Sequence, residues 1–115
     1  MLYKYNMSSA DADDQLFKAL ADRRRREILD LLKDGARTTG ELCARFEGAL
    51  DRCTVMQHLG VLERAELILV TREGRTRWNH LNAGPIRDIY ERWVSGYAAQ
   101  ALELLARLKR DLEDG

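Results

Sequence analysis

The sequence has few cysteines, one proline, few aromatic residues and no long apolar run, and these shortages exclude several classes of protein. Two cysteines are too few for the disulfide framework of a small secreted domain, which takes about four or more. The longest apolar run near the centre, Leu67–Val70, falls far short of the ~18 residues that cross a bilayer. Residues 1–6 lack the apolar stretch of a signal peptide. We therefore expect a cytoplasmic protein with reduced thiols and no membrane association.

Net charge is also absent, so the overall balance indicates no class of partner. Nineteen Lys and Arg residues balance nineteen Asp and Glu residues in a chain of 115. Hydrophobic residues make up 45% and charged residues 33%, which is typical of a globular chain and not of a disordered one. This length matches one hydrophobic core, so we expect a single domain over residues 11–115 after a flexible leader over residues 1–10.

N-capping residues and apolar periodicity predict four helices in the first part of the chain. A carboxylate or hydroxyl just before a helix accepts hydrogen bonds from its free N–H groups, and apolar residues three or four apart form its buried face. In the fourth helix this face consists of Val55, Leu59 and Leu62. The helices and their caps are residues 11–21, residues 22–33 with Asp22, residues 38–46 with a capping box of Thr38 and Glu41, and residues 51–64 with Asp51.

A β-hairpin and a long amphipathic helix are predicted to follow. Strands over residues 68–72 and 75–81 flank Glu73-Gly74, a two-residue turn in which glycine accommodates a positive φ. Gly84-Pro85 then precedes a helix over residues 86–112. The predicted fold is mainly α with a small β-hairpin, in the order α-α-α-α-β-β-α.

The last predicted helix carries an apolar face that is too wide for a small core to cover. Its apolar residues step by four and three, as in the seam of a coiled coil. A chain of this size also gains stability from association. We therefore expect the terminal helices to form a dimer interface, with Leu16 from the first helix and Tyr90, Trp93, Val94, Tyr97, Ala101, Leu104 and Leu108 from the last.

Four segments between Leu16 and Leu81 together resemble a known family. They read LFKALADRRRREILDLL, ELCARF, TVMQHLGVLERAELI and TREGRTRWNHLN. The combination is similar to the winged helix-turn-helix repressors of the ArsR type. The resemblance implies a winged helix-turn-helix fold and a homodimeric repressor that binds a pseudo-palindromic operator in double-stranded DNA. The sequence departs from the family pattern at Arg23, Met56 and Glu66, where proline, serine and glycine are common.

Two groups of polar and basic residues are candidates for contact with DNA. With the apolar face of residues 51–64 turned inward, the helical step of about 100° turns the polar side chains of this helix outward. Amide side chains there can pair with adenine edges, while arginines on a hairpin suit the minor groove or the flanking phosphates. The candidates are Arg52, Cys53, Thr54, Met56 and Gln57 on the helix and Arg72, Arg75 and Arg77 on the hairpin. The run Arg23–Arg26 points in several directions and is expected to be mainly structural.

Metal-sensing members of this family carry ligands that this sequence lacks, so we expect no metal and no other cofactor. One family pattern has a second cysteine two residues after the first, but Arg45 stands at that position after Cys43. Residues 86–112 contain no histidine, which excludes the other common ligand pattern on the last helix. A zinc or soft-metal site takes three or four such ligands.

Three other functions compete with DNA binding alone. A thiol-responsive repressor would use Cys53, because the first turn of a helix favours the thiolate. A winged-helix module that binds protein would use the same exposed surface. A thiol enzyme built on Cys53 and His58 is disfavoured, because residues five apart diverge by about 140° on a helix, so we expect no enzyme and no catalytic residue.

Overall fold

The computed structural model describes residues 9–114, and the chain divides at Pro85 into two compact units. Most of the predicted leader lies outside the described residues, but its last two positions, Ser9 and Ala10, are helical. The first helix therefore begins two residues before the predicted Asp11.

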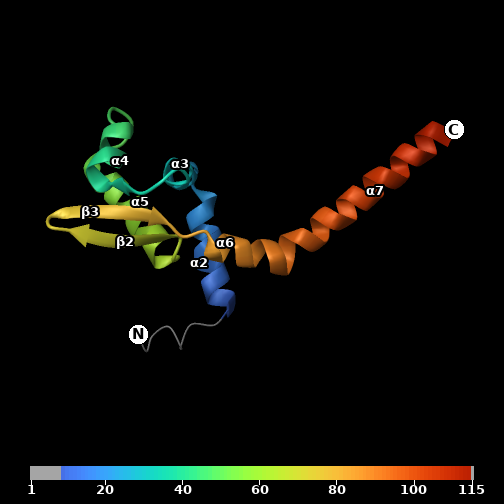
Figure 1. Cartoon of the computed structure of the whole chain (residues 1–115), viewed down its shortest axis with the longest axis horizontal. Coiled ribbons are helices and arrows are strands. Elements are labelled where there is room, and N and C mark those ends of the chain that lie inside the picture. Colours follow the sequence, from blue (N-terminus) through green and yellow to red (C-terminus); the bar gives the residue numbers. More distant parts are fainter. Residues whose placement is uncertain (1–8, 115) are drawn as a thin grey trace. The chain divides into compact units, whose positions relative to one another are not determined.

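The first unit contains four α-helices and three short strands among its described residues (Figure 1). The predicted helix order and hairpin are confirmed. The elements are α2 (Ser9–Ala21), α3 (Arg23–Leu32), β1 (Arg37–Thr38), α4 (Thr39–Arg45), α5 (Arg52–Arg64), β2 (Ile68–Glu73) and β3 (Thr76–Leu81).

All three predicted N-caps are confirmed by hydrogen bonds to free backbone N–H groups. The Asp22 carboxylate accepts from the amides of Arg24 and Arg25, at 2.8 and 3.2 Å. Thr38 and Glu41 form a reciprocal capping box at the start of α4. The Thr54 amide donates to the Asp51 carboxylate at 2.7 Å and fixes the start of α5.

The sheet has a third strand that the sequence does not predict. Strand β1 pairs antiparallel with β3, so the strand order is β1-β3-β2. Periodicity cannot reveal a strand of two residues, because no alternation develops over that length. The pairing joins the start of α4 to the hairpin.

The hairpin turn lies one residue later than predicted. Glu73 pairs with Thr76, so the two loop residues are Gly74 and Arg75 and not Glu73 and Gly74. Gly74 has a φ of 64°, while Arg75 has no positive φ. Glycine therefore occupies the first central position, where a type II′ turn needs it. This correction places Arg75 in the turn itself and not at the start of a strand.

The core of the first unit is built from the apolar faces of its helices and from β2. The predicted inward residues Val55, Leu59 and Leu62 are fully buried. Leu16, predicted at the dimer interface, is only 3% exposed. That assignment is corrected, because its side chain is already covered within the chain and is not available to a partner. The neighbouring Phe17 is the large apolar side chain that α2 leaves exposed.

A non-glycine residue adopts the left-handed conformation directly after α5. Glu66 has a φ of 61°, and its backbone carbonyl accepts a hydrogen bond from Asn82 Nδ2 at 2.7 Å. This is the position where the sequence departs from the glycine of the family pattern. A β-carbon is disfavoured in this conformation, so the departure is expected to reduce the free energy of unfolding.

We expect Glu66→Gly to be more stable than Glu66→Ala by about 1 kcal/mol, because both variants lose the side-chain contacts but only alanine keeps the strained β-carbon. Urea denaturation of the two variants measures this difference directly. Equal stability, or a more stable alanine variant, would contradict the assigned strain.

The second unit is helical but not one continuous helix. It contains most of α6 (Gly84–Ile89), then a π-helical segment η1 (Tyr90–Val94), and then α7 (Ser95–Asp114). The predicted helix over residues 86–112 is thus interrupted by one wider turn. Next to this turn the rings of Trp93 and Tyr97 pack edge to face, with centroids 5.6 Å apart.

Most large apolar residues of the second unit are exposed, whereas Ile89 is buried. The large side chains at least a third exposed include the predicted interface residues and three further leucines. They are Ile86, Tyr90, Trp93, Val94, Tyr97, Leu102, Leu104, Leu105, Leu108 and Leu112. Across the described part of the chain, no helix combines the length and the apolar character needed to span a membrane.

Candidate nucleic-acid interface

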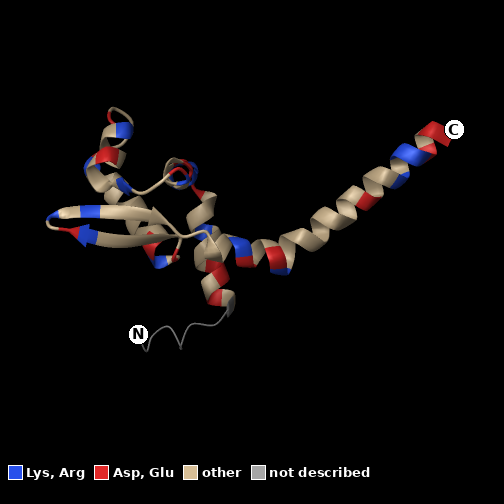
Figure 2. Ribbon diagram, viewed as in Figure 1, with Lys and Arg blue, Asp and Glu red and all other residues tan. Residues whose placement is uncertain are grey.

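A concave surface of about 440 Å³ lies where the start of α5, the hairpin and the start of α4 come together. Its lining contains four arginines and no acidic residue, so it offers a concentrated positive charge on a chain with no net charge. We call it the arginine groove, and Figure 2 shows basic segments on both strands of the hairpin. It is lined by Thr38, Thr39, Gly40, Arg52, Met56, Arg72, Arg75, Thr76 and Arg77.

The start of α5 is fixed by its N-cap. The Thr54 backbone amide donates to the Asp51 carboxylate, and hydrogen bonding by Thr54 holds the pKa of this carboxyl below its ordinary value. Thr54, whose hydroxyl is predicted to reach a base or phosphate, is half-buried beside this cap. The cap orients the first turn of α5, which carries Arg52 and Cys53.

The polar face of α5 is open, as the periodicity predicts. The side chains of Arg52, Cys53 and Gln57 are exposed, and Met56 is half-buried in the lining of the groove. Arg52 also donates to the Cys43 sulfur of α4 at 3.9 Å, a contact between the two helices. The exposed amide of Gln57 can donate and accept together, which is the pattern that reads an adenine edge.

The three hairpin arginines differ in their surroundings. The side chains of Arg72 and Arg75 are exposed and make no hydrogen bond or ion pair with other residues of the described range 9–114. Arg77 instead forms an ion pair with Glu63 of α5 at 3.1 Å, and its side chain is only 16% exposed. The sequence groups Arg75 and Arg77 together. In the structure the Arg75 side chain is available to a partner, whereas the Arg77 side chain already pairs with Glu63.

Besides Thr76 of the hairpin, three residues of the groove are absent from the predicted DNA contacts, namely Thr38, Thr39 and Gly40. The sequence identifies them only as the start of a capped helix. Their place beside the hairpin depends on the pairing of β1 with β3, in which Thr38 lies opposite Trp78. No local signal indicates a pairing over this separation.

The run Arg23–Arg26 is used inside the chain, as expected. Arg23 and Arg24 ion-pair with Glu27, while Arg26 donates to the Leu20 carbonyl. Arg25 donates to the carbonyls of Lys18 and Ala19 and contacts His58 Nδ1 at 3.3 Å. This run therefore connects α2, α3 and α5 and leaves the arginine groove as the basic surface of interest.

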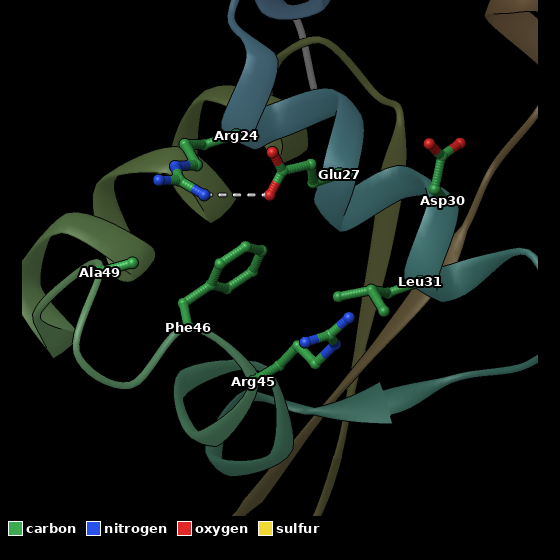
Figure 3. Close-up of a pocket in the computed structure, with 7 residues that line it drawn as sticks. All are labelled: Arg24, Glu27, Asp30, Leu31, Arg45, Phe46 and Ala49. Carbon is green, nitrogen blue, oxygen red and sulfur yellow. Dashed lines mark hydrogen bonds and ion pairs between the residues drawn. The ribbon is translucent and has the colours of Figure 1, made fainter.

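A second cavity, of about 370 Å³, lies between α3 and the end of α4. Figure 3 shows Leu31 and Phe46 pointing toward one another, with the Arg24–Glu27 pair at the edge. Arg24 and Arg45 are balanced by Glu27 and Asp30 in this lining, so the cavity has no charge preference for nucleic acid. Among the side chains of residues 9–114, no three His, Cys, Asp or Glu are placed to hold a metal ion.

The fold and the groove together define a winged helix-turn-helix domain, in which α4 and α5 form the helix pair and β2–β3 the wing. Comparison with known proteins agrees. A family model described as a helix-turn-helix domain matches residues 20–71. The transcriptional repressor SdpR of Bacillus subtilis is 36% identical over 75 residues, covering 65% of this chain and 81% of SdpR.

Two further relatives place the chain more narrowly. The arsenical resistance operon repressor of Staphylococcus aureus is 32% identical over 76 residues, covering 66% of this chain and 71% of that protein. The homodimeric winged helix-turn-helix DNA-binding domain Mb0332 of Mycobacterium bovis, a possible ArsR-family regulator, has a TM-score of 0.61 at 26% identity. That comparison covers 82% of this chain and 84% of the solved domain. The chain belongs to the ArsR family of winged helix-turn-helix transcriptional regulators.

Proposed function

We propose that this regulator is a cytoplasmic, homodimeric repressor that binds a pseudo-palindromic operator in double-stranded DNA. The arginine groove, with the open face of α5 beside it, carries the proposal. Helix α5 enters the major groove, with Gln57 at a base edge. Arg52, Arg72 and Arg75 neutralise phosphates on either side of it.

The exposed apolar face of the second unit supports the dimer. Its aromatic and leucine side chains, spaced by three and four along η1 and α7, form a larger apolar surface than a monomer normally leaves open. A second copy would cover this face and repeat the arginine groove about a two-fold axis. The relative Mb0332 domain is itself described as homodimeric.

Selection of duplex DNA by the purified protein tests the proposal. We expect the selected sequences to contain two inverted half-sites about one helical turn apart. Light scattering should give the mass of a dimer, and retention of DNA should weaken as salt is raised. Failure to retain any duplex at about 50 mM salt, where phosphate contacts are strong, would contradict DNA binding through this groove.

A reporter gene placed behind a selected operator tests the direction of regulation. We expect expression to fall when the protein is present and to recover when DNA contact is removed by mutation. A rise in expression would keep DNA binding but contradict repression.

A further inference from the structure

We infer that Glu63, Arg77 and Asn79 form a positioning network that fixes α5, the hairpin and α4 against one another for DNA binding. In this assignment Arg77 acts through its partners and is not itself a phosphate contact. The inference rests on the proposed function, because it concerns how the arginine groove is held in shape.

The network is a continuous series of hydrogen bonds through four elements. Arg77 Nη2 of β3 donates to Glu63 Oε1 of α5 at 3.1 Å. Arg77 Nε donates to Asn79 Oδ1 at 3.4 Å. The fully buried Asn79 then donates from Nδ2 to Thr39 Oγ1 of α4 at 3.1 Å and to the Arg37 carbonyl of β1 at 3.2 Å.

Each link joins parts of the chain that touch different sides of the groove. Glu63 belongs to the helix that carries Gln57, and Arg77 to the strand that leads from the Arg75 turn. Thr39 belongs to the helix whose first residues line the groove. A buried amide and a nearly buried guanidinium are directional, so they fix distances between these elements more narrowly than apolar contacts do. DNA contact requires such fixed distances, because phosphates and base edges have set spacings.

Burial also separates Arg77 from the arginines that are free to bind phosphate. To reach a phosphate, its guanidinium would have to leave Glu63 and Asn79, and Asn79 would lose a hydrogen-bond partner in a buried position. Arg72 and Arg75 can bind phosphate without such a cost, since their guanidinium groups have no partner within residues 9–114. We therefore expect the salt dependence of DNA affinity to respond differently to removal of Arg77 than to removal of Arg72 or Arg75.

The variant Glu63→Gln tests the network by the sign of its effect on affinity. Removing an acidic group near DNA should tighten binding if the group acts only through its charge. We instead expect Glu63→Gln to weaken operator binding about fivefold per subunit, which corresponds to loss of one hydrogen-bonded ion pair of ~1 kcal/mol in each subunit. The matched control is Glu73→Gln, the same charge change on the hairpin at an exposed residue outside the network, where affinity should be unchanged or higher.

Arg77→Ala gives a second, independent measurement. We expect affinity to fall by a similar factor at every salt concentration, with the slope of log affinity against log salt unchanged. If Arg77 bound a phosphate directly, its removal would lower the magnitude of this slope by ~0.9 for each phosphate released. A lowered slope for Arg77→Ala overturns the inference, and so does a Glu63→Gln variant that binds as tightly as Glu73→Gln. In both cases operator binding by the wild type leaves the proposed function intact.

Amide hydrogen exchange of the free protein tests the network without DNA. We expect faster exchange in β1 and β3 of Glu63→Gln than of Glu73→Gln, with both variants folded by circular dichroism. Equal exchange overturns the inference. If the wild type binds no duplex but exchange differs, the proposed function fails and the network remains as a structural feature.

Discussion

Replacing Leu104 and Leu108 together by lysine is expected to convert the protein from a dimer to a monomer and to abolish specific DNA binding. Both side chains lie on one face of α7 and are 58% and 56% exposed in the single chain. A leucine that becomes buried contributes about 1.5–3 kcal/mol, and the two-fold axis doubles each loss. The dimer should therefore weaken by at least about 10⁴-fold, and the added lysines would also repel one another.

DNA binding should be lost with the dimer because each monomer carries one reading helix. Two linked half-site contacts exceed one by roughly 10²–10⁴ in affinity. Light scattering and operator retention measure the two effects separately. Ala99→Lys with Ala106→Lys is the matched control, since it adds the same charge on the opposite side of α7. A dimeric leucine variant, or a monomer with wild-type affinity, would show that this face is not the interface.

Gln57→Ala is expected to remove most discrimination between operator and random DNA. A bidentate contact to one base contributes about 1–3 kcal/mol, so affinity for the operator should fall roughly 5- to 150-fold for each half-site. Affinity for random DNA and its salt dependence should change little, because Gln57 carries no charge. Titration of both duplexes over a range of salt measures the two quantities together. An equal loss on both duplexes would contradict base reading by Gln57.

Arg75→Ala should give the opposite pattern. Its exposed cation at the hairpin turn is expected to contact a phosphate, so binding to operator and random DNA should weaken alike. The salt slope should fall in magnitude by ~0.9 per subunit. Arg110→Ala, which removes an exposed arginine of α7, provides the control for net charge alone. An unchanged slope in Arg75→Ala would contradict phosphate binding at the turn.

The helix boundaries were predictable because their causes are local. Asp22, Thr38 and Asp51 each bond to backbone amides two or three residues later, and that spacing is visible in the sequence. The inward face of α5 follows from its apolar period in the same way. These local rules also fix which side of α5 is open, and thus place Gln57 at the surface.

The hairpin turn, strand β1 and the π-helical turn could not be predicted from local sequence rules. The strands of the hairpin were predicted, but the turn was placed one residue early. Glycine fits the first central position of a type II′ turn and also the second central position of a type I′ turn, so the sequence does not fix the register. Strand β1 was missed, since its partner lies about forty residues away and two residues carry no period. The π-helical turn at Tyr90–Val94 likewise has no signal in the apolar spacing.

By itself, the sequence determined the helix-turn-helix order, the hairpin, the family and the open face of α5, since each depends on residues near one another in the chain. Tertiary structure decided which cations are free. Arg75 and Arg77 look alike in sequence, but Glu63, fourteen residues before Arg77, forms an ion pair with Arg77 and not with Arg75. Leu16 was likewise assigned to the core by packing. The charge or apolar character of a side chain is set by its residue type. Whether that side chain can contact a partner depends on neighbours that are distant in sequence and come close only in the folded chain.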